Sequence, residues 1–461
     1  MGWEESAVRA AALATHELAL FAAVGIAIGG LDDLAVDLIW LARTLWRRVV
    51  VYTRHPRADA QGVAARGSGM VAVFVPAWHE AAVIGPMLET ALERWRGADC
   101  RIYVGCYPND PETWAAVQAV AAREPKVRPV LNPRDGPTTK ADNLNAMWRA
   151  LLADERTGAP VVAVALHDAE DVVHSAEIGI YAALCPRFDL VQLPVLPLIE
   201  RERGMWAQAI SSTYADEFSE SHGKVLTVRE AIGAGVPSAG VGCGFSRAAL
   251  DRIAARHGAP FDEGSVTEDY ELGLRIREMG GRGIFVRLPG NAGGGAVAVR
   301  AHFPDTLDAA VRQKARWQAG IALSGWGRLG WRGGWAEHWM RLRDRRAILA
   351  ALVLLCAYVS GAGWLVLNLF GRGPAFGPVA QALFAVCTGL MLWRLLVRAA
   401  FVTHAYGPLE GLASVPRTLL GNLIAMASAR RALISYLRLA RGAPLVWDKT
   451  EHSFPKAMPA E

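Results

Sequence analysis

Between about residues 68 and 320, short apolar runs alternate with stretches in which apolar positions recur every three or four residues. The apolar runs are MVAVFVPAWHE, CRIYVGCYP, KVRPVLN, PVVAVALHD and DLVQLPVL, and Pro, Gly or Asp bounds them. The stretches AAVIGPMLETALERW and DPETWAAVQAVAARE separate the first three runs and have the period of a helix. Strands that alternate with helices predict an α/β domain with a mostly parallel sheet.

Longer apolar runs without charges lie on either side of this region. Residues 347–370 and 374–393 are each about as long as a helix that crosses a bilayer. The run at 18–31 reaches that length only if the helix starts near Ala11 and includes His16 and Glu17. The segment before it, MGWEESAVRA, is acidic, which argues against a cleavable signal peptide. We therefore expect three membrane-spanning helices.

Composition and charge support a membrane protein. Hydrophobic residues make up 52% of the 461 residues, and the net charge is +5. Arginines cluster after the first and last apolar spans, so the positive-inside rule places the central region and the C-terminus in the cytoplasm. Such flanking charge favours anionic lipid headgroups over nucleic acid as a partner.

Two stretches near the spans have an interfacial composition. Residues 34–49 place Leu34, Leu38, Leu41, Leu45 and Val49 along one helical stripe, which indicates a helix lying in the membrane interface. A helix packed on the soluble domain stays open as an alternative. Residues 325–346 interleave tryptophans with arginines, as in a headgroup belt, and RLRDRR at 341–346 is expected on the membrane surface. The chain has six cysteines without C-x-x-C spacing, which indicates reduced thiols.

Polar residues follow the predicted strands in order. They are HE at 79–80, ND at 109–110, KADNLN at 140–145 and HDAED at 167–171. Ligands of parallel sheets bind at the carboxyl ends of the strands. The carboxylates of Asp168, Glu170 and Asp171 need a nearby cation, and two of them at i and i+2 suit a divalent metal that substrate phosphates also bind. We expect Asp168 and Glu170 to bind it, with Asp171 or a backbone group in support. Taken singly, an Asp after a strand is more often a turn or a helix cap.

Two helical motifs follow. TEDYELGLRIREMGG starts with Thr267 as an expected N-cap and carries acids in its first turn. Glu268 and Asp269 serve either chemistry or only the helix dipole. RQKARWQAG places Gln313, Arg316 and Trp317 close to one helical face, where a guanidinium suits a phosphate and an indole suits a sugar ring.

The ordered series HE, ND, KADNLN, DAED, TED and QKARW resembles the processive family 2 membrane glycosyltransferases, the group of the cellulose, chitin and hyaluronan synthases. The resemblance covers about residues 70–320. The variant DAED, the stretch LDDLAVDLIW and the tail VWDKTEHSFP resemble most closely the NfrB-type membrane glycosyltransferases of phage adsorption. Two positions depart from the pattern, since His79 stands where Asn is common and Glu170 replaces the second Asp of D-x-D.

The resemblance implies a GT-A fold, a mixed and mostly parallel sheet flanked by transmembrane and interfacial helices. It implies an inverting glycosyltransferase of the bacterial inner membrane that uses a nucleotide sugar, most often a UDP-sugar, with Mg²⁺ or Mn²⁺. Matched by motif, the implied donor-binding residues are Glu80, Asp110, Lys140, Asp168, Gln313 and Arg316. The implied metal ligands are Asp168 and Glu170, the general base is Asp269 with Glu268 beside it, and the acceptor contacts are Trp317, Cys243 and Gly244.

We expect five segments. They are 1–66 with the first span and the interfacial helix, 67–324 as the GT-A domain, 325–346 as an interfacial helix, 347–406 with two spans, and 407–461 with interfacial helices and a cytoplasmic tail. Three helices are too few to enclose a wide sugar channel, so export of a polysaccharide requires a homo-oligomer or an export partner. The acceptor is a growing glycan or a lipid-linked sugar. Single-sugar transfer to a polyprenyl phosphate and a non-enzymatic envelope assembly or receptor role remain as alternatives.

Overall fold

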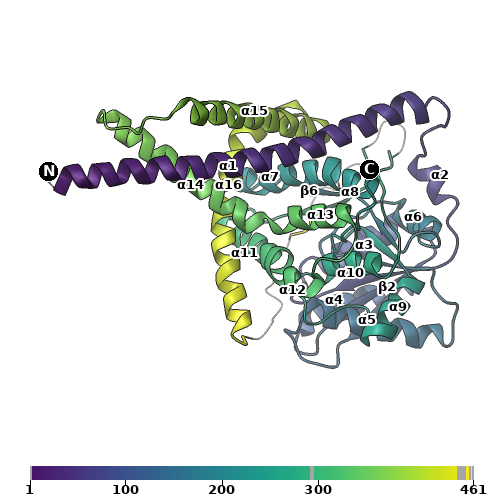
Figure 1. The fold of residues 1–461 in the computed structure, drawn as a ribbon. Helices are drawn as coiled ribbons and strands as arrows, with labels where there is room; N and C mark the ends of the chain where they lie inside the picture. Colours follow the sequence, from purple (N-terminus) through teal and green to yellow (C-terminus); the bar gives the residue numbers. More distant parts are fainter. Residues whose placement is uncertain (1–2, 291–294, 444–452, 456–457, 459–461) are drawn as a thin grey trace.

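The computed structural model describes residues 3–290, 295–443, 453–455 and 458. A seven-stranded sheet in the order β3-β2-β1-β4-β7-β5-β8 forms the centre of the globular part (Figure 1). Its strands are β1 (Val71–Pro76), β2 (Cys100–Cys106), β3 (Val127–Leu131), β4 (Ala163–Leu166), β5 (Leu190–Gln192), β7 (Cys243–Ser246) and β8 (Gly283–Phe285). Only β7 runs antiparallel to its neighbours within this sheet, so the prediction of a mixed, mostly parallel sheet is confirmed. A second, parallel sheet pairs β6 (Val195–Leu198) with β9 (Val299–His302).

The sheet is buried on both faces because apolar residues occupy both sides of its strands. In β1, Val73 and its odd-numbered neighbours pack on one helical layer, while Ala72 and Phe74 pack on the other. The first layer comprises α2 (Ala60–Ala64), α3 (Ile84–Arg94), α4 (Pro111–Ala121) and α6 (Glu177–Leu184). The second comprises α5 (Lys140–Glu155), α9 (Arg247–His257) and α10 (Glu268–Glu278). Each layer therefore buries apolar side chains against one face of the sheet.

The short strands β7, β8 and β9 were not predicted from the sequence. They are three or four residues long, and β7 reads CGFS, which lacks the apolar run that marks a buried strand. β7 is inserted between β4 and β5, and it pairs with residues far away in the sequence. Pairing partners, rather than local propensity, therefore decide these strands.

Within the described residues, three helices are long and apolar enough to cross a membrane. They are α1 (Trp3–Trp46), which continues as a π-helical segment to Val51, α14 (Ala347–Leu369) and α15 (Pro378–Tyr406). Their positions match the predicted spans. Figure 1 shows α1, α14 and α15 extending together away from the sheet.

The structure differs from the expectation of a separate interfacial helix after the first span, because α1 runs through the whole stretch without a break. Asp32 and Asp33, which directly follow the apolar run at 18–31, pair with Arg343 and Arg346. These ion pairs compensate the two carboxylates inside the helix, so the chain does not have to leave the helix at this point. The amphipathic stripe itself is present on α1, and four of its five residues are among the exposed large hydrophobic residues: Leu38, Leu41, Leu45 and Val49.

The stretch 325–346 also differs from its prediction. It forms two helices, α12 (Gly325–Leu329) and α13 (Trp335–Arg345), instead of one. The arginines of RLRDRR do not form a membrane-surface patch, because Arg341 and Arg345 are buried and donate to backbone carbonyls of 325–330. These guanidinium groups instead have acceptors inside the protein, which are backbone carbonyls and carboxylates.

The remaining helices link the sheet to the membrane helices. They are α7 (Met205–Glu220), α8 (Leu226–Ala231), α11 (Leu307–Gln318) and α16 (Pro408–Ala440), with π-helical segments at Ser221–Val225 and Ala319–Ser324. One helix, α16, stands where several interfacial helices were expected, and it is not among the candidate spans. It packs against α15, α11 and α7. Most of the tail VWDKTEHSFP lies outside the described residues.

A close approach between β2 and α5 fixes the start of α5, which carries Lys140. Asn143 donates from Nδ2 to the carbonyl of Gly105, at 3.0 Å. A Cβ at Gly105 would lie 1.8 Å from Asn143 Oδ1, so only glycine fits without displacing the helix.

We predict that Gly105→Ala destabilises the fold by about 1–3 kcal/mol, because it overpacks this contact. Thermal unfolding of the detergent-solubilised protein measures the effect. Gly85→Ala is the matched control, since nothing lies within 4 Å of a Cβ there and the position is inside α3. Equal melting temperatures for Gly105→Ala and Gly85→Ala would contradict the prediction.

Candidate active site

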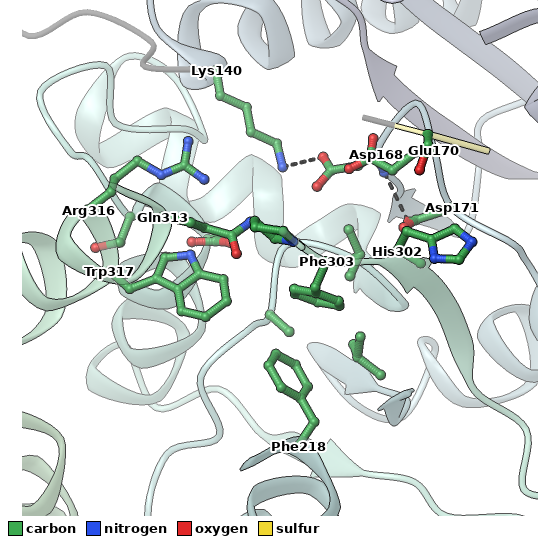
Figure 2. A pocket seen from close by; sticks show the side chains of 18 of the residues that line it. Lys140, Asp168, Glu170, Asp171, Phe218, His302, Phe303, Gln313, Arg316 and Trp317 are labelled. Carbon is green, nitrogen blue, oxygen red and sulfur yellow. Dashed lines mark hydrogen bonds and ion pairs between the residues drawn. The ribbon is translucent and has the colours of Figure 1, made fainter. Parts of the chain in front are cut away.

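A cavity of about 220 Å³ opens where β4, the N-terminus of α10 and one face of α11 meet (Figure 2). Residues from the sheet edge, from the TED helix and from the QKARW helix line it together. The predicted site residues among its lining are Lys140, Asp168, Glu170, Glu268, Asp269, Gln313, Arg316 and Trp317. Six sequence motifs that lie far apart in the chain were proposed to meet, and four of them contribute to this one cavity.

The turn after β4 holds three carboxylates, and each has a different environment. Asp168 Oδ1 accepts a hydrogen bond from Lys140 Nζ at 2.5 Å (Figure 2). Asp171 also lines the cavity, and its Oδ2 accepts the backbone N–H of Asp168 at 3.0 Å. Glu170 is buried and lines the cavity. Asp171 therefore shapes the turn, while Asp168 and Glu170 present carboxylates to the cavity.

His167 lies behind this turn as a buried cation. Its Nδ1 is 3.0 Å from Asp171 Oδ2, and its Nε2 is 3.1 Å from Glu177 Oε2. Burial by itself would lower the pKa of His167, but the Glu177 carboxylate and the Asp171 hydrogen bond outweigh it and raise the pKa to about 10. A charged His167 between two carboxylates fixes the orientation of Asp171 and, through it, the turn that carries Asp168.

Glu268 and Asp269 begin α10 at the opposite wall. Burial raises the pKa of Glu268 to about 7, and the charge of Asp269 adds to this shift. Burial also raises the pKa of Asp269, although Lys140 opposes the change. The backbone of Gly240, at φ 75°, lies so close that a Cβ there would be 2.1 Å from Asp269 Oδ2. Thr267 is at the N-cap position as expected, but its hydroxyl makes no capping hydrogen bond.

One face of α11 closes the cavity. Gln313, Arg316 and Trp317 all line it, as their helical spacing predicts (Figure 2). Trp317 belongs to an aromatic group with Tyr214, Phe218 and Phe303, in which ring centroids are 4.9–6.4 Å apart. Flat apolar rings therefore form one wall, opposite the carboxylates.

Glu80 and Asp110 lie at the carboxyl ends of β1 and β2, but neither is among the described residues that line this cavity. They are close to each other, since Asp110 accepts the backbone N–H of His79 at 2.6 Å. Thr113, at the start of α4, connects them: its hydroxyl accepts the backbone N–H of Glu80, and its own N–H donates to Asp110. His79 has a left-handed backbone, at φ 54°. These residues form a second part of the same sheet edge.

A chain of hydrogen bonds connects that part to Lys140. Asn109 exchanges two hydrogen bonds with the backbone of Gly136, at 2.6 and 2.8 Å. Tyr107 hydrogen-bonds Thr138 at 2.7 Å, and Thr139 caps α5, which Lys140 begins. The polar residues after β1 and β2 are thus connected to the cavity through the segment 136–140.

The structure does not bring Cys243 and Gly244 to the cavity. Both lie in β7, where they pair with Leu166 and Ala165 of β4 and are covered by neighbouring strands. The loop before β7 lines the cavity instead, through Ala239 and Val241. The acceptor assignment of Cys243 and Gly244 is therefore corrected, because strand pairing occupies them. All six cysteines, each within the described residues, are free, as expected.

The donor set suits a divalent cation that a substrate completes. No cluster of three or more His, Cys, Asp or Glu side chains with the geometry of a metal site occurs in the described part of the chain. Two carboxylates, Asp168 and Glu170, line the cavity from positions i and i+2 of the turn. Mg²⁺ and Mn²⁺ accept such oxygen ligands and take the rest of their shell from phosphates and water. The residues therefore fit a metal held jointly with a diphosphate.

Several lining residues were not predicted. Glu200 lies beside His302, with 3.9 Å between Oε2 and Nδ1, and Arg203 pairs with Asp305 at 3.0 Å. Phe218 and Phe303 also contribute. They come from α7, from the end of β9 and from the loops that follow β6 and β9, which the pairing of β6 with β9 brings together. For Phe303, the alternation in VAVRAHF after residue 296 is a local signal of a strand that leads to the cavity.

Comparisons with known proteins agree with these motifs. The sequence model described as "Glycosyltransferase like family 2" matches residues 68–320. The chain is 39% identical over 469 aligned positions to "Bacteriophage adsorption protein B" of Escherichia coli (strain K12), and equally to "Bacteriophage N4 adsorption protein B" of Escherichia coli O157:H7. Each alignment covers 95% of this chain and 62% of the relative, so the chain spans less than two thirds of these proteins.

Similarity to solved structures is more distant. The mannosyltransferase PcManGT from Pyrobaculum calidifontis, in complex with GDP-Man and Mn²⁺, has a TM-score of 0.46 and 17% identity, over 89% of this chain and 99% of that one. The glucosyl-3-phosphoglycerate synthase of Mycobacterium tuberculosis, with Mn²⁺ and UDP-glucose, has a TM-score of 0.34 and 17% identity, over 59% of this chain and 84% of that one.

The coupled acids at the start of α10 lead to a pH prediction. Because the pKa values of Glu268 and Asp269 are raised, the pair takes up a proton at a higher pH than exposed carboxyls, which titrate near about 4. A reaction that needs this pair deprotonated loses rate as the pH falls towards and below neutrality. The pH dependence of kcat/KM measures the midpoint, and an acid limb at about pH 4 would argue against this environment.

A second prediction concerns the buried cation behind the turn after β4. His167→Asn leaves Asp171 and Glu177 facing each other without a charge between them, and we expect a loss of about 3–5 kcal/mol in unfolding free energy. Thermal unfolding measures it, with His257→Asn at the exposed end of α9 as control. If both variants melt like the wild type, His167 does not carry the charge.

Proposed function

The chain belongs to glycosyltransferase family 2, and on that basis we propose that it transfers a sugar from a nucleotide-sugar donor, inverting the anomeric carbon, during synthesis of an envelope or extracellular polysaccharide. The observation that carries the proposal is the meeting of Asp168, Glu170, Asp269, Arg316 and Trp317 at one cavity. Each supplies a group that glycosyl transfer requires, and they come from three separate motifs.

The donor lies along the carboxyl edge of the sheet in this proposal. The nucleoside occupies the part near Glu80 and Asp110, and the diphosphate reaches Lys140 and Arg316. A UDP-sugar is the donor that the family resemblance favours. Lys140 pairs with Asp168, and a bound diphosphate gives its ammonium group a second anionic partner.

Asp168 and Glu170 hold a divalent cation, Mg²⁺ or Mn²⁺, together with the donor diphosphate. When bound, such an ion neutralises charge that develops on the departing diphosphate. The protein adds Arg316 and Lys140 to the same task, with Gln313 as a neutral donor beside them. The turn that presents Asp168 is held by Asp171 and His167, which accounts for the clustering of charge in HDAED.

Asp269 acts as the general base. Direct displacement at the anomeric carbon needs a base that takes the acceptor hydroxyl proton on one side and a stabilised leaving group on the other. The raised pKa of Asp269, which burial causes and the charge of Asp168 increases, makes it a better proton acceptor than an exposed carboxylate. The backbone of Gly240 limits the positions that the Asp269 carboxylate adopts.

Trp317 and the aromatic wall bind the acceptor. Indole and phenyl faces bind the apolar face of a sugar ring, and Phe303 and Phe218 extend that surface beyond Trp317 (Figure 2). An acceptor site longer than one ring favours a growing glycan over a single transfer. Transfer to a polyprenyl phosphate remains the second candidate, favoured by the close association of the domain with the membrane helices.

The catalytic domain faces the cytoplasm of a bacterial cell from the inner membrane in this proposal. The arginines that follow the spans support this orientation. With three candidate spans among the described residues, passage of a polymer across the membrane requires a second copy or an export partner.

A donor screen tests the proposal. Membranes with the full chain receive Mg²⁺ or Mn²⁺ and a panel of UDP- and GDP-sugars, and release of nucleoside diphosphate is followed with product size. We expect release from one donor, loss of about 10²-fold or more in Asp269→Asn, and a ladder of products. Asp251→Asn, an exposed acid of α9, should retain wild-type activity.

A single lipid-linked product would assign the protein to carrier glycosylation instead. Equal release by the wild type and Asp269→Asn would exclude Asp269 as the base. Release from no donor would favour the non-enzymatic envelope role.

A further inference from the structure

A second, larger cavity lies where the membrane helices meet the globular part. Its volume is about 710 Å³, and it is enclosed by the C-terminal half of α1, the end of α15, the segment 224–230 and the edge strand β8 with the residues after it. Among the described residues it shares no lining side chain with the candidate active site. We call it the neck cavity, and the residues that define it are Arg48, Arg57, Arg287, Leu41, Trp40 and Phe401.

The neck cavity has an excess of positive charge. Its lining includes the cations Arg43, Arg47, Arg48, Arg57, Lys224 and Arg287 but only the acids Asp37 and Glu230. Both acids are already paired, Asp37 with Lys224 and Glu230 with Arg43 at 3.2 Å. Among the residues that the structure describes, the other four arginines form no ion pair with a carboxylate. The cavity therefore gathers uncompensated positive charge.

Arg287 shows how close these charges are. It is half-buried on the strand edge and donates from Nη1 to the carbonyl of Gly223 at 2.8 Å. Burial lowers the pKa of Arg287, and the charges of Arg57 and Arg43 lower it further. Like charges at such a site repel one another, and a bound anion relieves that repulsion.

One part of the lining of the neck cavity is apolar. Trp40, Leu41, Val397 and Phe401 line it from α1 and α15. On α1 this wall continues into exposed leucines, since Leu38, Leu41 and Leu45 have exposed fractions of 53%, 51% and 59%. A soluble anion would not be stabilised by these apolar side chains. A lipid, by contrast, places its headgroup among cations and its acyl chains along apolar helices.

We propose that the neck cavity binds the phosphate headgroup of an anionic phospholipid. Arg48, Arg57 and Arg287 contact the phosphate, for which guanidinium groups are suited because they donate two parallel hydrogen bonds. The acyl chains follow the groove between α1 and α15, against Leu41 and Phe401. The inference is independent of the sugar chemistry and goes beyond the proposed function.

Native mass spectrometry of the full chain in detergent tests this site directly. Phosphatidylglycerol is titrated against wild type and against Arg48→Gln/Arg57→Gln, two exposed arginines of the cavity. The control, Arg54→Gln/Arg66→Gln, removes the same charge from exposed positions that do not line the cavity. We expect at least about a fivefold loss of phosphatidylglycerol affinity in the first variant and less than about twofold in the control. Arg287→Gln should also lose affinity, with its folding checked by thermal unfolding.

Three outcomes would overturn the proposal. Equal affinities for phosphatidylcholine and phosphatidylglycerol would show that the site does not select lipids by the negative charge of the headgroup. Equal losses in the two double variants would mean diffuse attraction rather than a site. Displacement of the lipid by millimolar inorganic phosphate or by a nucleoside diphosphate would identify a soluble anion as the ligand.

Discussion

Compensation of buried carboxylates is the constraint on which the site depends. The chain places acids at the end of β4 and at the start of α10, in surroundings that penalise negative charge. Lys140 and His167 supply cations on either side of the β4 turn. Lys140 lies 2.5 Å from Asp168 and His167 lies 3.0 Å from Asp171, so each of these two carboxylates has a cation beside it. The fold therefore holds the carboxylates of the β4 turn in place with buried partners.

The same rule joins the membrane helices to the globular part. Asp32 and Asp33 of α1 meet Arg343 and Arg346 near the start of α14. Glu220, at the end of α7, pairs with Arg398 of α15 at 2.6 Å. These contacts fix the helices against the domain, so the aromatic wall on α11 and the neck cavity keep their positions relative to the membrane. These charges inside or beside the spans thus have ion-pair partners in the protein. The arginines without a carboxylate partner among the described residues of this region lie in the neck cavity.

Much of the fold followed from the sequence where the pattern is local. Four of the five apolar runs each became one strand, the fifth was divided between β5 and β6 in two different sheets, and the spacing of Gln313, Arg316 and Trp317 put them on one face. Prediction failed where distant partners decide the outcome. β7 forms only because β4 and β5 flank it, which also removed Cys243 and Gly244 from the cavity. Likewise, α1 continues past Asp32 because arginines about 310 residues later compensate it.

The sequence predicted many residues of the site, but it did not predict how the surrounding loops and helices are arranged around the cavity. Acids after strands and the TED and QKARW motifs carry a local signal, so most of the residues that line the cavity from these motifs were named from the sequence. Glu200, Phe218 and Phe303 lie in segments whose approach depends on the second sheet and on α7. Glu80 and Asp110 lie on the same edge of the sheet but outside the cavity lining. Hydrogen bonds between Asn109 and Gly136 connect their part of the edge to the segment that leads to Lys140.

Binding of Mn²⁺, followed by electron paramagnetic resonance of the free ion, tests the central claim most directly. If Asp168 and Glu170 share a metal with the donor diphosphate, the solubilised protein alone should leave most Mn²⁺ free. Addition of UDP should then bind about one equivalent, and Glu170→Gln should abolish that binding. Tight Mn²⁺ binding without UDP, or unchanged binding in Glu170→Gln, would contradict the account.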